Sequence, residues 1–126
     1  MIRMLLVAAL LAIALVSCGQ DTPEDAAPPG DDAAAPATAR FVAVDIAFDE
    51  APSELPAGDV TVELTNEGEI AHNVVFEQAG DEPVAEAAAG ETAGGTVRLE
   101  PGEQVFYCSQ PGHRDAGMEG TVSVTG

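Results

Sequence analysis

The chain has 126 residues, which is enough for one small domain. It carries 22 Asp and Glu against 4 Lys and Arg, a formal net charge of −18, and so acidic a chain lacks the cations that bind nucleic-acid phosphates. Two cysteines exclude a disulfide-rich scaffold, and two histidines exclude a catalytic centre built from several of them.

The start of the chain has the features of an export signal. Arg3 precedes an unbroken apolar run over 4–16, which is shorter than the roughly 20 residues of a membrane-spanning helix. The run ends in Leu-Val-Ser-Cys18, which resembles the lipobox of bacterial lipoproteins; the alternative is a buried helix that ends in a cysteine. We therefore expect 1–17 to be a lipoprotein signal peptide and Cys18 to carry the lipid. The mature chain would then contain one other cysteine and no intramolecular disulfide.

Residues 18–40 are predicted to be the lipidated cysteine and a tether. The segment 19–39 has no aromatic and no branched aliphatic residue and is rich in Pro, Ala and Asp. Such a segment buries too little apolar surface to offset its conformational entropy, so we expect it to be disordered and to act as a spacer. The folded domain is predicted to span 41–126.

The predicted domain shows the pattern of short β-strands. Large apolar residues alternate with smaller or polar ones over 42–48 and over 60–64, which predicts two half-buried strands. In the first of these, the residues expected to face the core are Val42, Val44, Ile46 and Phe48. Further short strands are predicted around 74–76, 97–99, 105–108 and 122–124, with Pro, Gly and Asn turn signals between strands.

One segment of the domain has a different pattern. Residues 83–89, which begin with Pro83 and are closed by Gly90, predict one or two helical turns. Taken together, the elements predict an all-β fold, a small antiparallel Greek-key β-sandwich or barrel.

Residues that bind soft metals are rare beyond Cys18. They are His72, Cys108, His113 and Met118, and the last three lie within eleven residues. Two imidazoles, a thiolate and a weak axial thioether form the ligand set of an electron-transfer copper site, whereas zinc usually takes a better fourth ligand than methionine. Each of these residues alone is more often part of the core or surface, so the combination and its spacing carry the prediction.

Two stretches that contain these residues resemble those of a known family. Residues 106–122, FYCSQPGHRDAGMEGTV, resemble the copper loop of the cupredoxins, the plastocyanin/azurin family, and 71–76, AHNVVF, resemble its first-histidine segment. The resemblance covers about 41–126. Four residues separate Cys108 from His113, as in azurins, and four separate His113 from Met118, one more than in azurins. The subfamily therefore stays open.

The resemblance implies one copper ion that alternates between Cu(I) and Cu(II), and a role for each matching residue. The metal ligands would be the buried His72, the thiolate of Cys108, His113 with its ring edge at the surface, and the weak axial Met118.

The residues around these ligands receive roles from the same resemblance. Asn73 and Ser109 would hydrogen-bond and so connect the two ligand-bearing segments, and the carbonyl of Ala71 would approach copper axially. Asn73 alternatively caps a turn. Tyr107 either offers a second route for electrons or is an ordinary surface tyrosine, and Arg114 with its neighbour Asp115 is expected to be a solvated loop tip.

The function that these features predict is one-electron transfer between a redox donor and an acceptor. The carrier would be exported and lipid-anchored, at a periplasmic face or on the outer surface of the plasma membrane, and it would not be an enzyme, because multicopper enzymes need more histidines. The alternatives are a lipoprotein that buffers or delivers copper, and a domain that only binds partners.

The charge of the predicted domain bears on its partners. It has 17 acidic residues against Arg98 and Arg114, or −15, which would steer basic partners or simply keep the protein soluble. So high a charge also favours a monomer.

Overall fold

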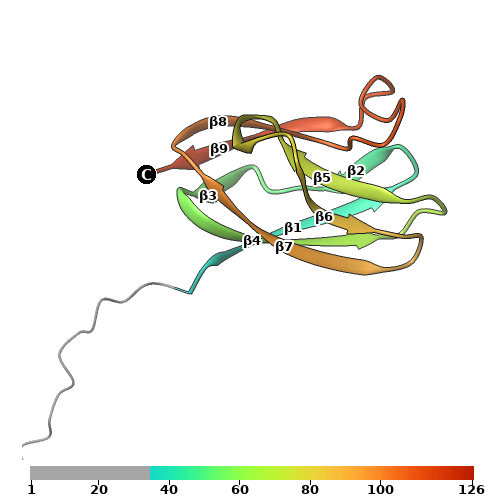
Figure 1. The fold of residues 1–126 in the computed structure, drawn as a ribbon, viewed down its shortest axis with the longest axis horizontal. Coiled ribbons are helices and arrows are strands. Elements are labelled where there is room, and N and C mark those ends of the chain that lie inside the picture. Colours follow the sequence, from blue (N-terminus) through green and yellow to red (C-terminus); the bar gives the residue numbers. More distant parts are fainter. Residues whose placement is uncertain (1–34) are drawn as a thin grey trace, which may run out of the picture. The chain divides into compact units, whose positions relative to one another are not determined.

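The computed structural model describes residues 35–126, and the predicted signal peptide, Cys18 and tether residues 18–34 lie outside the described residues. Within 35–126 no helix is long and apolar enough to cross a membrane. The described chain forms nine strands and one 3-10 helix (Figure 1), which are β1 (Ala37–Val44), β2 (Ala47–Glu50), β3 (Glu54–Pro56), β4 (Gly58–Asn66), β5 (His72–Phe76), η1 (Glu77–Ala79), β6 (Pro83–Ala87), β7 (Thr92–Leu99), β8 (Gly102–Tyr107) and β9 (Glu119–Thr125). The first strand begins at Ala37, so residues 37–40 of the predicted tether belong to this strand.

The strands form two sheets that face each other across one apolar core. The first sheet has the order β2-β1-β4-β7 and the second β3-β9-β8-β5-β6. Strands β1 and β4 pair in parallel, as do β3 and β9, and the other pairs are antiparallel. The predicted all-β sandwich is therefore confirmed, with two parallel pairs within a mainly antiparallel arrangement.

The predicted alternation is right for β4 and, apart from Phe48, which packs against the core, wrong for the first strand. Val60, Val62 and Leu64 are fully buried, as predicted. In the first strand, by contrast, Phe41 and its alternating neighbours face the core. The segment 42–48 is not one strand, because a turn at Asp45 and Ile46 divides β1 from β2 and leaves Ile46 42% exposed. Apolar residues at both odd and even positions, with Phe41 beside Val42, made the inward face ambiguous in the sequence.

The helical turns predicted over 83–89 are also wrong. This segment is the strand β6, which pairs with β5 so that His72 lies opposite Ala87. Ala85 and Ala87 point into the core, and Pro83 occupies the first strand position, where its missing N–H is tolerated. Pairing with a neighbouring strand has overridden the local helical tendency of an alanine-rich segment.

All four phenylalanines of the chain meet in the core. The ring of Phe41 lies 5.1 Å from that of Phe106, 5.7 Å from Phe48 and 6.2 Å from Phe76, in edge-to-face arrangements. Such pairs add to the stabilisation from buried apolar area. Phe106 belongs to β8, which leads to Cys108, and Phe76 belongs to β5, which begins at His72. The cluster therefore supports the two neighbouring strands that carry the site.

A glycine on β7 allows the edge strands of the two sheets to approach closely. A Cβ atom at Gly95 would collide with the backbone carbonyl of Val84 on β6, whereas one at Gly94 would lie 3.1 Å from the carbonyl oxygen of Val62. We expect Gly95→Ala to destabilise the fold by about 1–3 kcal/mol, because backbone must move. Gly94→Ala should cost less. Urea denaturation of the two variants measures the difference, and equal losses would contradict this reading of the β6–β7 edge.

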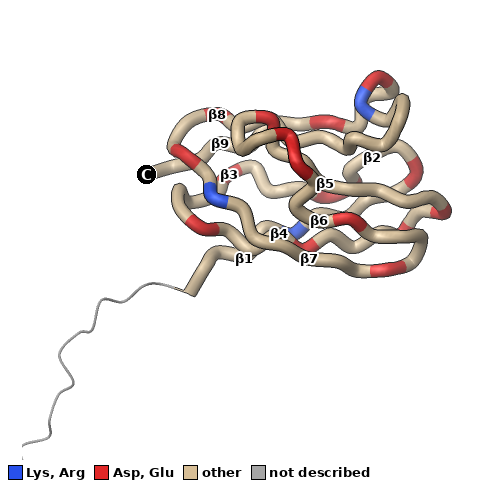
Figure 2. Tube along the Cα trace, viewed as in Figure 1, with Lys and Arg blue, Asp and Glu red and all other residues tan. Residues whose placement is uncertain are grey.

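Acidic side chains cover the described surface, and the few basic ones are ion-paired. Figure 2 shows Asp and Glu on both sheets and in their loops. Each arginine within 35–126 forms an ion pair, and the pairs are Arg40 with Glu63, Arg98 with Asp59, and Arg114 with both Glu77 and Glu119. The described surface therefore presents a negative field with no unpaired arginine in it.

Candidate metal centre

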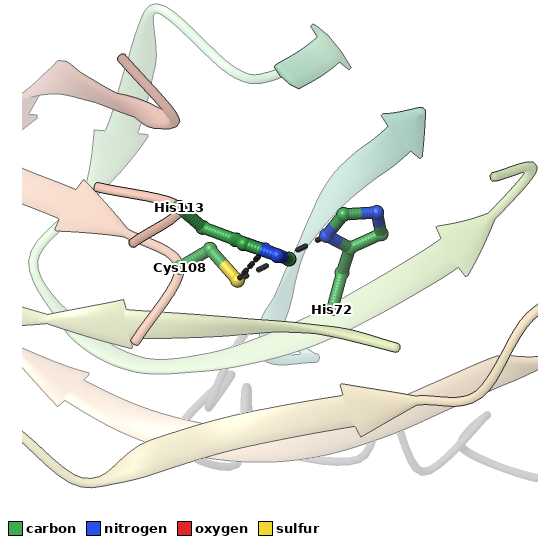
Figure 3. A group of neighbouring side chains, drawn as sticks. All are labelled: His72, Cys108 and His113. Atoms are coloured by element: carbon green, nitrogen blue, oxygen red, sulfur yellow. Dashed lines mark hydrogen bonds between the residues drawn. The ribbon is translucent and has the colours of Figure 1, made fainter. Parts of the chain in front are cut away.

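Three of the four predicted soft-metal ligands converge at one end of the sandwich (Figure 3). His72 is the first residue of β5, and Cys108 directly follows β8, its neighbour in the sheet. His113 lies in the loop between β8 and β9. The Sγ of Cys108 lies 3.4 Å from Nδ1 of His113 and 4.0 Å from Nδ1 of His72. The possible ligand atoms all lie within 4.8 Å of one another.

These separations fit a single bound metal ion. Metal bonds of about 2.0 Å to an imidazole nitrogen and about 2.3 Å to a thiolate, spread at trigonal angles, place sulfur and nitrogen about 3.7 Å apart. The two observed sulfur–nitrogen distances, 3.4 and 4.0 Å, lie on either side of that value. The three side chains can therefore bind one ion with small adjustments of the rings.

Met118 is held beside these residues by the backbone of the loop. Its N–H donates to the carbonyl of His113 (3.0 Å), and its own carbonyl accepts from the N–H of Cys108 (3.0 Å). Its side chain is fully buried. Gly112 and Gly117 have φ angles of 80° and 103°, a left-handed conformation that favours glycine, so these two positions allow the loop to close. The ligand role of Met118 stays a prediction.

Asn73 connects the segments that carry His72 and Cys108. Its Nδ2 donates to Oγ of Ser109 (2.9 Å), and its Oδ1 accepts from the N–H of Ser109 (2.8 Å). The N–H of Asn73 also points at Sγ of Cys108, at 3.5 Å, where it would stabilise a thiolate. Ala71 directly precedes His72 and is exposed, and its predicted axial contact stays a prediction.

The His72 imidazole lies in an environment that favours its neutral form. Burial, and secondly the nearby His113, lower the pKa of His72, whereas the carboxylate of Asp45 opposes this shift. A neutral imidazole is the form that binds metals. Its Nε2 lies 3.8 Å from Oδ1 of Asp45 and has no hydrogen-bond partner among the described residues. Sequence reasoning missed Asp45, which lies far from His72 in the chain and belongs to no motif.

Comparison with known proteins identifies the family. The family profile described as copper binding proteins, plastocyanin/azurin family, matches residues 38–125. The chain belongs to this family. Copper is therefore the cofactor of this plastocyanin/azurin-family protein, and its thiolate and imidazoles are ligand types that copper accepts.

Solved structures of auracyanins are similar to this plastocyanin/azurin-family chain. Auracyanin B has 28% identity and a TM-score of 0.61, covering 73% of this chain and 91% of its own. Auracyanin from the photosynthetic bacterium Roseiflexus castenholzii has 22% identity and a TM-score of 0.60, covering 73% and 99%. Auracyanin A from Chloroflexus aurantiacus, described as a "blue" copper protein, has 24% identity and a TM-score of 0.57, covering 72% and 100%. No match was found among curated proteins.

Of the two residues predicted as a solvated loop tip, Asp115 is exposed, whereas Arg114 is ion-paired and its side chain is 40% exposed. Its guanidinium group donates to Glu77 (2.6 Å) on η1 and to Glu119 (2.8 Å) on β9, and it lies 4.1 Å above the ring of Tyr107. The hydroxyl of Tyr107 donates to Asp81 (2.9 Å), which raises the pKa of Tyr107. In this plastocyanin/azurin-family protein, Arg114, the residue after His113, therefore connects the loop to η1 and to β9.

Proposed function

We propose that this protein carries single electrons between redox partners while a lipid on Cys18 holds it at a membrane surface. The observation that carries the proposal is the convergence of two imidazoles and one thiolate, within 4.8 Å, in a protein of the plastocyanin/azurin family. Copper, when bound, supplies a couple that gains and loses one electron. His72, Cys108 and His113 would hold it, with Met118 as a weaker fourth ligand.

The surroundings of the ligands favour electron transfer over copper delivery. His72, Cys108 and Met118 are fully buried, and the hydrogen bonds of Asn73 to Ser109 fix the segments next to two of them. A ligand frame that is fixed before metal binding keeps its geometry when the charge of the ion changes, so little reorganisation is needed. Rapid exchange of copper would require the opposite, an open and adaptable set of ligands.

The exposed part of the site would be the contact point for partners. His113 is the one member of the imidazole–thiolate cluster that is partly exposed, and most of the loop around it is exposed. A donor or acceptor that binds at this loop would lie next to a ligand. The docking surface of that partner would be basic, because acidic residues dominate the described surface of this protein (Figure 2).

The entry point of the chain agrees with an N-terminal anchor. Ala37, where β1 begins, pairs with Val60 near the start of β4, at the end of the sandwich away from the ligand loop (Figure 1). The other end of β1 leads to Asp45, which lies beside His72. The chain therefore enters the described domain at the end of the sandwich opposite the site. The compartment would be the periplasm or the outer surface of the plasma membrane.

The visible spectrum of the full chain in detergent tests the proposal. Addition of one equivalent of Cu(II) should give an intense blue or green colour from charge transfer between the thiolate and copper, and one electron equivalent should bleach it. Cys108→Ser should abolish the colour. Cys18→Ser, a matched change at the only other cysteine, should leave it intact. Weak, colourless copper binding would refute the carrier and favour metal handling.

A further inference from the structure

We propose that Asp45 is a positioning residue that fixes the orientation of the His72 imidazole and lowers the reduction potential of the copper site. The inference deepens the proposed function and rests on it. Asp45 belongs to neither stretch that carries the sequence resemblance, and it lies in the turn between β1 and β2, in the sheet opposite that of His72.

The two ring nitrogens of His72 face different side chains. Nδ1 lies 4.0 Å from Sγ of Cys108, within the ligand cluster. Nε2 lies 3.8 Å from Oδ1 of Asp45, and it is buried with no hydrogen-bond partner among residues 35–126. A neutral imidazole has one protonated nitrogen, and the nitrogen that binds a metal must be the bare one. The proton therefore belongs on Nε2, where it faces the carboxylate.

The loop that leads to His72 is built around this carboxylate. The N–H of Glu69 donates to Oδ1 of Asp45 (2.8 Å), and a Cβ atom at Gly68 would collide with the same oxygen. The side-chain oxygen of Asn66 accepts from the N–H of Gly68 (2.9 Å), and its Nδ2 donates to the carbonyl of Ile70 (2.7 Å). The contacts of this loop therefore hold the Asp45 carboxylate in place.

The turn that carries Asp45 is strained, which indicates that its shape is imposed by its surroundings. Ile46 has a φ angle of 58°, a left-handed conformation that is rare for a β-branched residue. Strain of this kind persists where neighbouring contacts fix the backbone, and it is concentrated at functional sites. Here the imposed turn leaves the Asp45 carboxylate next to the buried edge of the imidazole.

The Asp45 carboxylate acts both on the His72 ring and on a metal bound at its Nδ1. It keeps the proton on Nε2 and so sets the tautomer and the ring orientation, as carboxylates beside metal-binding histidines do. Its negative charge also favours Cu(II) over Cu(I), because the more highly charged ion gains more from a nearby anion. Removal of that charge should therefore raise the reduction potential.

The measurement is the midpoint potential of the copper-loaded full chain and its Asp45→Asn variant. Asparagine keeps the shape of the side chain and an oxygen for the N–H of Glu69. Partners of this kind change metal affinity by 10-fold or more, so we expect the ratio of Cu(II) to Cu(I) affinity to fall about 10-fold, which is about +59 mV. Asp49→Asn is the matched control, because the Asp49 side chain is exposed and forms no hydrogen bond or ion pair with the described residues. It should change the ratio less than about 2-fold.

A second readout needs neither copper nor electron transfer. In the metal-free wild-type protein, where no bound ion forces the choice of nitrogen, ¹⁵N–¹H spectra should show a proton on Nε2 of His72 that exchanges slowly with water. Asp45→Asn should speed that exchange at least about 10-fold. This experiment decides the question in the wild type even if the variant fails to fold.

The outcomes separate the inference from the proposed function. Copper that gives no charge-transfer colour with the wild type refutes the carrier itself. A coloured wild type whose Asp45→Asn potential equals that of Asp49→Asn overturns the role of Asp45 alone. A wild-type spectrum without a proton on Nε2 overturns it as well.

Discussion

Copper binding should raise the midpoint of thermal unfolding by about 16–33 °C, and Cys108→Ala should remove that gain. A ligand present at 1,000 times its dissociation constant stabilises the folded state by about 4.1 kcal/mol, and each kcal/mol is worth about 4–8 °C in a domain of this size. Copper should bind the folded state much more tightly than the unfolded chain, because His72 and Cys108 are 36 residues apart in the chain and meet only when β5 and β8 pair. Differential scanning calorimetry with and without Cu(II) measures the gain.

The comparison is made between the apo and copper forms of each variant. Cys108→Ala also leaves a small cavity in the core, and this lowers both midpoints together. A chelator should return the wild type to its apo midpoint. Equal midpoints of the two wild-type forms, at saturating copper, would mean that copper binds the unfolded chain as well as the folded one, which the separation of the ligands argues against.

Phe41→Ala should cost about 3–5 kcal/mol of unfolding free energy. The side chain of Phe41 is 1% exposed, and its ring contacts those of Phe48, Phe76 and Phe106 edge to face. Because domains are stable by about 5–15 kcal/mol in total, this single change removes about a fifth or more of the total stability. Guanidinium denaturation of the apo protein, analysed as a two-state transition, gives the number.

The matched control for Phe41 is a large apolar side chain outside the core. Ile70 is 42% exposed, and Ile70→Ala should change the unfolding free energy by about 0.5 kcal/mol or less. Similar losses at positions 41 and 70 would contradict the assignment of the four phenylalanines as the centre of the core.

The fold was predictable where one face of a strand carries all the large apolar residues. Strand β4 has this property, and its buried set of Val60, Val62 and Leu64 follows from period-two alternation. Strand β1 lacks it, and the inward position of Phe41 depends on pairing with β4 and on the turn at Asp45 and Ile46. The strand β6 was predicted as helix because only its long-range pairing with β5 makes it extended.

The candidate site was predictable for a chemical reason. Histidine, cysteine and methionine are so rare in this chain that their grouping over 108–118, with one more histidine upstream, carries information without any structure. The residues around the ligands were harder to find. Aspartate and arginine are common surface residues, so neither the carboxylate of Asp45 nor the ion pairs of Arg114 could be distinguished from solvated charges before the chain was folded.

Tyr107 gives the protein an optical probe of its own. The chain has no tryptophan and this one tyrosine, which is the last residue of β8 and directly precedes Cys108. Emission that is excited at wavelengths phenylalanine does not absorb therefore comes from a single ring, fixed by Arg114 above it and by Asp81 at its hydroxyl. Metal occupancy, loop opening and partner docking at this end of the sandwich can each be followed in real time from that emission, with no label attached.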